Sequence, residues 1–108
     1  MGNIKDKTAI VGMGCTPFGE LWNKGIPDLI IDATYEACED AGITLKDVEA
    51  VFFGNLHSGI MTAGPVAEAL QLDCKPVTRL ENNCASGAEA LRVAALSVAS
   101  GMYDVVLA

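Results

Sequence analysis

The amino-acid sequence predicts an α/β fold in which helices pack on a mainly parallel sheet. Short, continuous apolar runs at residues 8–11, 50–54 and 105–108 are typical of strands buried in such a sheet. Helical patterns lie between these runs, and a further short strand over residues 76–81 leads through a tight turn into a long helix. The resulting order, β-α-β-α-β-α-β, is characteristic of a layered α/β domain. With 108 residues the chain forms one ordinary domain at most.

The first predicted strand, residues 8–11, ends at Gly12, and Gly12-Met13-Gly14 is similar to the beginning of a dinucleotide-binding fingerprint. Pro17 stands where the phosphate-binding helix would have to run, and no third glycine follows in register. We therefore interpret residues 15–25 as a loop and expect no nucleotide site there.

A helix is predicted to open at Pro27 and Asp28 and to end at Gly42, because proline and an acid suit a first turn and glycine suits the residue after the last turn. Its apolar stripe is formed by Leu29, Ile30, Ala33, Ala37 and Ala41. Its other face carries Asp32, Glu36, Glu39 and Asp40. We interpret this acidic cluster as a solvated helix face rather than a metal site, because such patterning is the norm for surface helices.

The middle of the chain is predicted to contain a second strand and a short helix. Residues 43–49 connect to the strand at residues 50–54 and hold a short helical turn. A loop over residues 55–64 contains His57, and a short helix follows at residues 65–70. Residues 71–75 then lead into the strand at residues 76–81, which begins with a proline.

Cys84 lies in the turn between this strand and the long helix predicted over residues 85–100. The start of a helix presents unpaired N–H groups and the positive end of the dipole, and this setting makes a cysteine nucleophilic. The alternative is an inert cysteine in the core, which is the commonest environment of a free thiol. The polar residues before Cys84 and the small Ser86-Gly87 pair after it favour a reactive, approachable thiol.

The composition indicates that part of the surface meets protein. Hydrophobic residues make up 51% of the chain and charged residues 19%, and the helix over residues 85–100 is apolar nearly all round. The last apolar run ends at Ala108 without a turn or cap. We therefore expect residues 1–108 to be the opening part of a longer protein.

Charge and cysteine usage exclude several classes of partner. A formal net charge of -7 argues against nucleic acid, because phosphate binding needs a basic face. Cys15, Cys38, Cys74 and Cys84 are irregularly spaced, and with one histidine they predict no metal site and no disulfide framework. Reduced thiols and the lack of a signal peptide predict a cytoplasmic location, and no apolar stretch is long enough to span a membrane.

Several stretches together resemble the N-terminal part of the thiolases, especially the sterol-carrier-protein-type and archaeal-type acetyl-CoA acyltransferases. They are I-V-G-M-G-C-T-P-F-G at residues 10–19, D-A-G-I at 40–43, V-F-F-G-N at 51–55, E-N-N-C-A-S-G-A-E-A-L at 81–91 and S-G-M-Y-D-V-V-L-A at 100–108. The resemblance covers nearly the whole chain in order, and the cysteine turn is its specific part. It implies a layered αβαβα thiolase fold made of two similar halves, with this chain in the first.

The resemblance also implies the chemistry. Cys84 would be the nucleophile that carries an acyl group, with acyl-CoA and coenzyme A as substrates and no bound cofactor. Thiolases cleave 3-oxoacyl-CoA with free CoA or run the reverse Claisen condensation. Their activating histidine and their acid/base cysteine lie in the second half, so neither role is assigned to His57, which we interpret as a loop or interface residue.

The family further suggests a homodimer, or a dimer of dimers, through the region from Val77 to Ser100. Some members of this branch bind a small zinc-containing OB-fold subunit. Two other functions remain open. One is a ketoacyl-synthase-like or hydroxymethylglutaryl-CoA-synthase-like condensation, which the Asn82-Asn83 pair and the T-P-F-G loop disfavour. The other is a non-catalytic lipid-transfer or scaffold subunit, which the intact cysteine turn disfavours.

Overall fold

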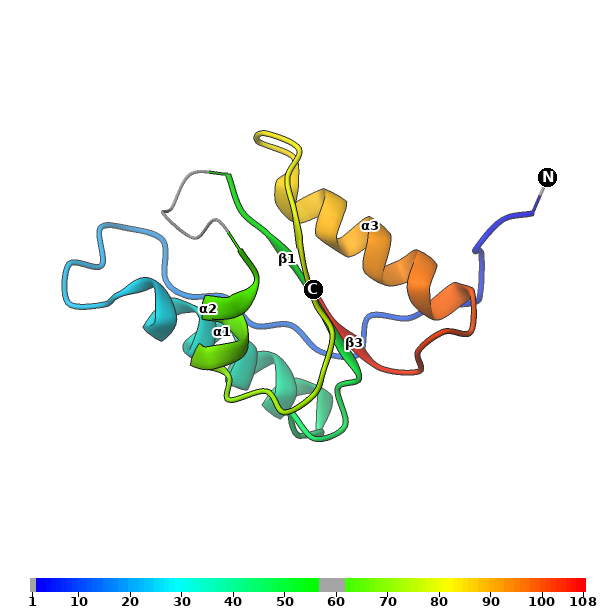
Figure 1. Cartoon of the computed structure of the whole chain (residues 1–108), viewed down its shortest axis with the longest axis horizontal. Helices are drawn as coiled ribbons and strands as arrows, with labels where there is room; N and C mark the ends of the chain where they lie inside the picture. The colour runs from blue at the N-terminus through cyan, green and yellow to red at the C-terminus, as the bar shows by residue number, and fades with distance from the viewer. Residues whose placement is uncertain (1, 57–61) are drawn as a thin grey trace.

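The computed structural model describes residues 2–56 and 62–108, and Figure 1 shows the whole chain. Three helices and three strands occur in this described part. Their order is α1 Ile26–Ala41, β1 Ala50–Gly54, α2 Gly64–Ala69, β2 Val77–Leu80, α3 Ser86–Ala99 and β3 Val106–Leu107. Each of these elements was predicted from the sequence, and each lies within two residues of its expected bounds.

The strands form a parallel sheet with β1 in the middle, in the order β2-β1-β3. Val51 lies opposite Val77, and Gly54 lies opposite Leu80. Ala50 lies opposite Val106 on the other side. Because β1 and β2 are parallel and in register, their carboxyl ends meet at one edge of the sheet, and the turn that carries Cys84 starts from this edge.

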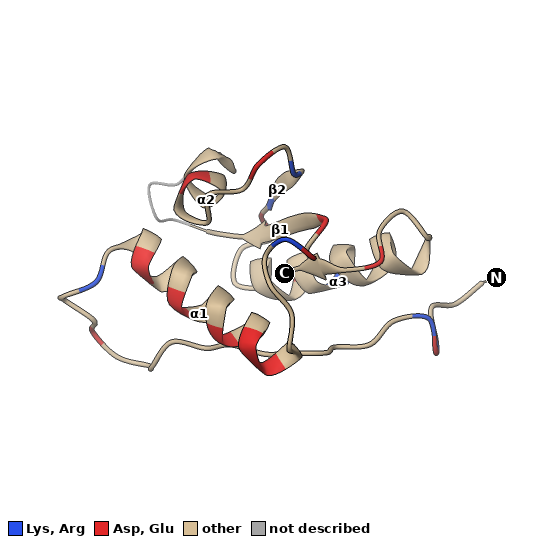
Figure 2. Ribbon diagram, turned by 90° about the horizontal axis from the view of Figure 1, so that it is seen from below, with Lys and Arg blue, Asp and Glu red and all other residues tan. Residues whose placement is uncertain are grey.

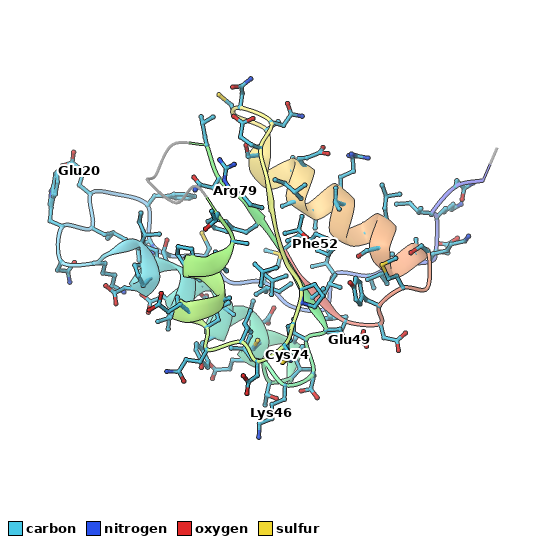
Figure 3. All side chains as sticks on the ribbon, viewed as in Figure 1. Glu20, Lys46, Glu49, Phe52, Cys74 and Arg79 are labelled. Carbon is cyan, nitrogen blue, oxygen red and sulfur yellow. The ribbon has the colours of Figure 1, made fainter. Side chains whose placement is uncertain are left out.

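Helices cover both faces of the sheet, as Figure 1 shows for α1 and α2 on one side and α3 on the other. On the first side the buried core consists of Val48, Val51, Val66 and Leu70. On the second side it consists of Ala50, Phe52, Ala90 and Ala94. Phe52 of β1 points toward α3 (Figure 3). Successive side chains of β1 thus pack into the cores on opposite faces of the sheet, which is why the strand is apolar without interruption.

The ends of α1 follow from local chemistry. Asp28 accepts a hydrogen bond from the Gly25 N–H at 2.7 Å, and Pro27 occupies the first turn, where its missing N–H costs nothing. Gly42 ends the helix at a φ of 70°, a left-handed conformation that glycine adopts without strain. Figure 2 shows acidic residues along the outer side of this helix. None of the described helices has the length and apolarity needed to cross a membrane.

The prediction of a strand at residues 8–11 was wrong, because the structure has an extended segment there without a sheet partner. Ile10 and Val11 are 68% and 65% exposed. The chain instead runs across α1, where the Met13 N–H donates to Asp40 and the Cys15 N–H donates to Glu36. β1 has a neighbour on each side, and the segment has its hydrogen-bond partners on α1 and not in the sheet.

The acidic residues of α1 therefore have a structural role, because they bind the segment that precedes the helix. Two of its carboxylates accept the backbone hydrogen bonds from Met13 and Cys15, and Asp32 forms an ion pair with Lys24. Across residues 2–56 and 62–108 there is no group of acidic, histidine or cysteine side chains that could hold a metal ion.

Candidate functional site

Cys84 stands in the turn that joins β2 to α3. Its side chain is exposed and its thiol is free. In the part of the chain that the structure describes, no group hydrogen-bonds to its sulfur. The alternative of a cysteine sealed in the core is therefore wrong for this position, and the sulfur is open to a reagent from solvent.

The turn itself is tight. Asn83 has a φ of 47°, in the left-handed region that side-chain-bearing residues rarely adopt. Asparagine is one of the few residues that tolerate this region. The Ala85 N–H donates to the Asn82 carbonyl at 2.9 Å, and the Ser86 N–H donates to the Asn83 carbonyl at 3.2 Å. The chain thus reverses within a few residues and leaves Cys84 at the outside of the bend.

Ser86, the first residue of α3, closes the turn from inside. Its side chain is buried, with 5% of the residue exposed. The hydroxyl accepts a hydrogen bond from the Asn82 N–H at 2.9 Å and donates one to the Asn83 carbonyl at 2.7 Å. A single hydroxyl therefore satisfies two backbone groups that come directly before Cys84. The sequence marked Ser86 only as a small residue and gave no sign of this role.

The start of α3 retains free donors close to Cys84. Ala85 precedes the helix and offers no side-chain cap. Within the described residues, no acceptor receives the N–H groups of Gly87 and Ala88. Unpaired N–H groups and the positive end of the helix dipole favour negative charge at this position. The turn therefore combines an exposed sulfur with an electropositive backbone.

Gly54, at the end of β1, lies directly beneath the start of α3. A Cβ atom added there would come within 3.0 Å of backbone atoms of Ser86 and Gly87. Such contacts essentially never occur in folded proteins, so this position requires glycine. Sequence reasoning placed Gly54 in the strand and missed the contact. The available signal was the glycine itself, which within a strand often marks the close approach of another backbone.

The carboxyl ends of β1 and β2 are also joined by side-chain chemistry. Arg79 of β2 donates a hydrogen bond from Nη2 to the Asn55 carbonyl at 3.0 Å, and the Asn55 N–H donates to the Leu80 carbonyl at 3.2 Å. Figure 3 shows Arg79 near this end of the two strands. These bonds extend the pairing of β1 and β2 beyond the last strand residues, up to the point where the cysteine turn begins.

The other predicted residues lie elsewhere. Cys15 and Cys74 are exposed and free, and Cys74 precedes β2 whereas Cys84 follows it. Cys38 is buried in α1, and burial raises the pKa of its thiol, with a smaller contribution from the negative charge of Asp47. His57 lies outside the described residues, so the structure adds nothing to its interpretation.

An open apolar groove of about 400 Å³ runs beside α3 and β2. Phe52, Thr78, Val93 and Leu96 are among its lining residues. The groove does not include Cys84, so it is separate from the cysteine turn. It also lies next to the outer edge of β2, which has no strand partner among the described residues.

Comparison with known proteins now decides the family. Residues 8–108 match the model of the thiolase N-terminal domain. The chain belongs to the thiolase family. The structure has the α/β architecture with a parallel sheet that the thiolase fold predicts.

Individual proteins are similar to this chain in sequence or structure. The chain is 46% identical over 104 residues to an acetyl-CoA acetyltransferase of Methanocaldococcus jannaschii, covering 92% of this chain and 26% of that protein. It is 33% identical over 109 residues to sterol carrier protein 2 of Bos taurus, covering 97% of this chain and 20% of that protein. The solved structure of an acetyl-CoA acetyltransferase from Syntrophomonas wolfei matches with a TM-score of 0.75 and 27% identity, covering 87% of this chain and 26% of that one. The chain thus spans about a quarter or less of the length of these relatives.

Proposed function

We propose that the full-length protein transfers acyl groups between the Cys84 thiolate and coenzyme A thioesters. The reaction would be thiolysis of 3-oxoacyl-CoA or the reverse Claisen condensation. One observation carries the proposal, namely the exposed, free thiol of Cys84 at the start of α3 in a chain of the thiolase family. The names of two relatives, both acetyl-CoA acetyltransferases, support the same class of reaction.

In the thiolysis direction, the Cys84 sulfur attacks the C3 carbonyl carbon of a 3-oxoacyl-CoA. The C2–C3 bond then breaks, and acetyl-CoA leaves once its enolate has taken a proton. The sulfur of free CoA attacks the acyl-enzyme, releases the shortened acyl-CoA and restores the Cys84 thiolate. The proton lost by this CoA thiol balances the proton taken by the enolate.

The backbone around Cys84 suits these steps. The attacked carbonyl oxygen becomes negative, and N–H donors at the beginning of a helix stabilise such a charge without reorganisation. The free N–H groups of Gly87 and Ala88 and the uncapped start of α3 supply positive potential at this place. The groups that move the protons are proposed to lie outside residues 1–108, because the resemblance to thiolases implies an activating histidine and an acid/base cysteine in the second half of the fold. The one histidine of this chain, His57, is not assigned either role.

Mass spectrometry of the full-length protein tests the assignment. After incubation with 3-oxoacyl-CoA and no free CoA, the wild-type protein should carry one acyl group on the peptide that contains Cys84. Cys84→Ala should carry none, and steady turnover should fall by about 10³-fold or more, because the covalent intermediate is lost. Cys74→Ala, which removes another exposed thiol, should keep both the adduct and the turnover. An acyl adduct that persists in Cys84→Ala would overturn the assignment.

We also propose that two copies associate through the region from Val77 to Ser100. β2 is the outer strand of the sheet, and an unpaired strand edge favours association with another chain. Leu91 and Leu96 of α3 are both exposed, and Leu96 lines the apolar groove beside β2. An exposed apolar groove beside an unpaired strand edge is consistent with a protein interface.

A further inference from the structure

We infer that Ser86 and Asn83 together position Cys84, with the Ser86 hydroxyl holding Asn83 in its left-handed conformation. This inference deepens the proposed function and rests on it for its consequence for acyl transfer. Its structural basis is independent of that function, because it consists of backbone geometry and hydrogen bonds around the turn. In this assignment Ser86 is a positioning residue that acts through the backbone and does not touch the substrate.

The first step of the argument is the conformation of Asn83. With a φ of 47°, this residue occupies a region that is energetically unfavourable for an L-amino acid compared with its favoured regions. Asparagine lowers this cost but does not remove it. Some interaction must therefore hold the turn in place, because a relaxed Asn83 would redirect the chain one residue before the thiol.

The second step is the hydrogen bonding of Ser86. The hydroxyl accepts from the N–H before Asn83 at 2.9 Å and donates to the Asn83 carbonyl at 2.7 Å. The hydroxyl is therefore hydrogen-bonded to the backbone both before and after the φ and ψ rotations of Asn83. Two net hydrogen bonds in a buried setting contribute free energy of the same order as the cost of the left-handed conformation.

The third step is the support behind Ser86. The residue is almost fully buried, and its backbone rests on Gly54 so closely that no side chain fits between them. The hydroxyl therefore cannot shift to follow a relaxed turn. β1, through Gly54, fixes the start of α3; Ser86 fixes Asn83; and Asn83 directs Cys84 outward.

Variants of the full-length protein test the inference by two readouts. The first is the alkylation rate of each cysteine by iodoacetamide as a function of pH, read by mass spectrometry. The second is acyl transfer, separated into kcat and KM. In Ser86→Ala, the alkylation rate of Cys84 relative to Cys74 should fall by about tenfold, because loss of two hydrogen bonds releases the turn and moves the thiol away from the start of α3. The kcat of acyl transfer should fall by a similar factor.

Two further variants separate positioning from general instability. Asn83→Ala keeps the Ser86 hydroxyl but disfavours the left-handed conformation, and it should reproduce the effect of Ser86→Ala. Asn83→Gly in the Ser86→Ala background adopts that conformation freely, and it should restore most of the lost kcat. Cys38, which is buried, reports folding in the same experiment, because it becomes labelled only when the protein opens.

The outcomes distinguish the two proposals. A wild-type protein that forms no acyl adduct on Cys84 overturns the proposed function, whatever the variants do. A wild-type adduct with an unchanged Cys84 labelling ratio and kcat in Ser86→Ala overturns the positioning role. Loss of kcat without rescue by Asn83→Gly, together with labelling of Cys38, also overturns it, since the hydroxyl would then stabilise the fold and not the turn.

Discussion

Gly54 controls how closely the start of α3 approaches the sheet. Replacing it with alanine places a Cβ within 3.0 Å of backbone atoms of Ser86 and Gly87, and backbone cannot move aside as a flexible side chain can. We expect Gly54→Ala to lower the free energy of unfolding by about 1–3 kcal/mol, the usual cost of overpacking. The same shift should displace the turn and lower the alkylation rate of Cys84. Chemical denaturation and mass spectrometry measure the two effects.

Gly87→Ala is the matched control, because it makes the same substitution on the α3 side of the contact. A Cβ at Gly87 meets no atom within 4 Å, and the residue lies inside α3. Alanine there should raise the free energy of unfolding by up to about 1 kcal/mol through helix propensity. Equal effects of the two substitutions would show that backbone entropy, not contact with α3, explains the glycine at position 54.

At the residue scale, the sequence predicted the exposed cysteine but not its supports. The position of Cys84 follows from local pattern alone, since a strand, a polar turn and an uninterrupted helix are adjacent in the chain. The role of Gly54 depends on a contact with Ser86, 32 positions away, which no local pattern specifies. The hydrogen bonds of Ser86 are local, but a serine at a helix start can bond in several ways, so its identity alone did not specify them. The left-handed Asn83 was equally hidden, because asparagine is common in turns of every type.

At the scale of elements, Glu49 attaches β3 to the sheet. Its carboxylate accepts hydrogen bonds from the backbone N–H groups of Asp104 and Val105, at 2.5 and 3.1 Å. Figure 3 shows Glu49 at this end of the molecule. β3 has only two residues, so these bonds are a large part of what holds the end of the chain. The bond from Asp104, followed by that from Val105, lowers the pKa of Glu49.

We expect Glu49→Gln to destabilise the attachment of β3 at neutral pH and to have little effect in acid. A carboxyl group whose folded pKa is lowered stabilises the fold above its unfolded value of 4.5, and that stabilisation is lost as the pH falls through the folded pKa. Amide hydrogen exchange of residues 104–107 at pH 7 and at low pH measures the difference. Glu20→Gln, at an exposed loop position, is the control and should change nothing at either pH.

An unchanged exchange rate in Glu49→Gln at pH 7 would show that the sheet pairing of β3 is sufficient without the carboxylate.

The strand β3 also illustrates what the sequence can and cannot specify. The apolar runs at residues 105–108 and 8–11 look alike, yet only the first forms a strand, because it alone lies beside β1. A strand is a property of two segments, and a pattern in one segment does not name its partner.

At the scale of the whole molecule, the apolar excess of the sequence is visible on the surface. Phe18 and Trp22 before α1, Leu91 and Leu96 on α3 and Met102 after it are all exposed. The sequence predicted such a surface from 51% hydrophobic residues in a chain of 108. It could not say which elements would carry it, because that depends on which helix faces the sheet covers.

A substitution on the exposed side of α3 tests the proposed dimer. Leu96 is 41% exposed and lines the groove beside β2, so an interface through this region would bury it. We expect Leu96→Glu in the full-length protein to raise the dimer dissociation constant by about a hundredfold or more, because an unpaired buried charge costs on the order of 3 kcal/mol. Sedimentation velocity over a range of concentrations measures it.

Tyr35→Glu provides the comparison for that experiment, because Tyr35 is also exposed but lies on α1, across the sheet from α3. It should leave the dissociation constant unchanged. If Leu96→Glu unfolds the protein and leaves no dimer to measure, the charge has entered an intramolecular core, and the rest of the polypeptide covers α3. If both variants dimerise as the wild type does, association uses another surface. Only selective loss of the dimer in Leu96→Glu, with the melting of the separated subunits unchanged, fits an interface formed by β2 and α3.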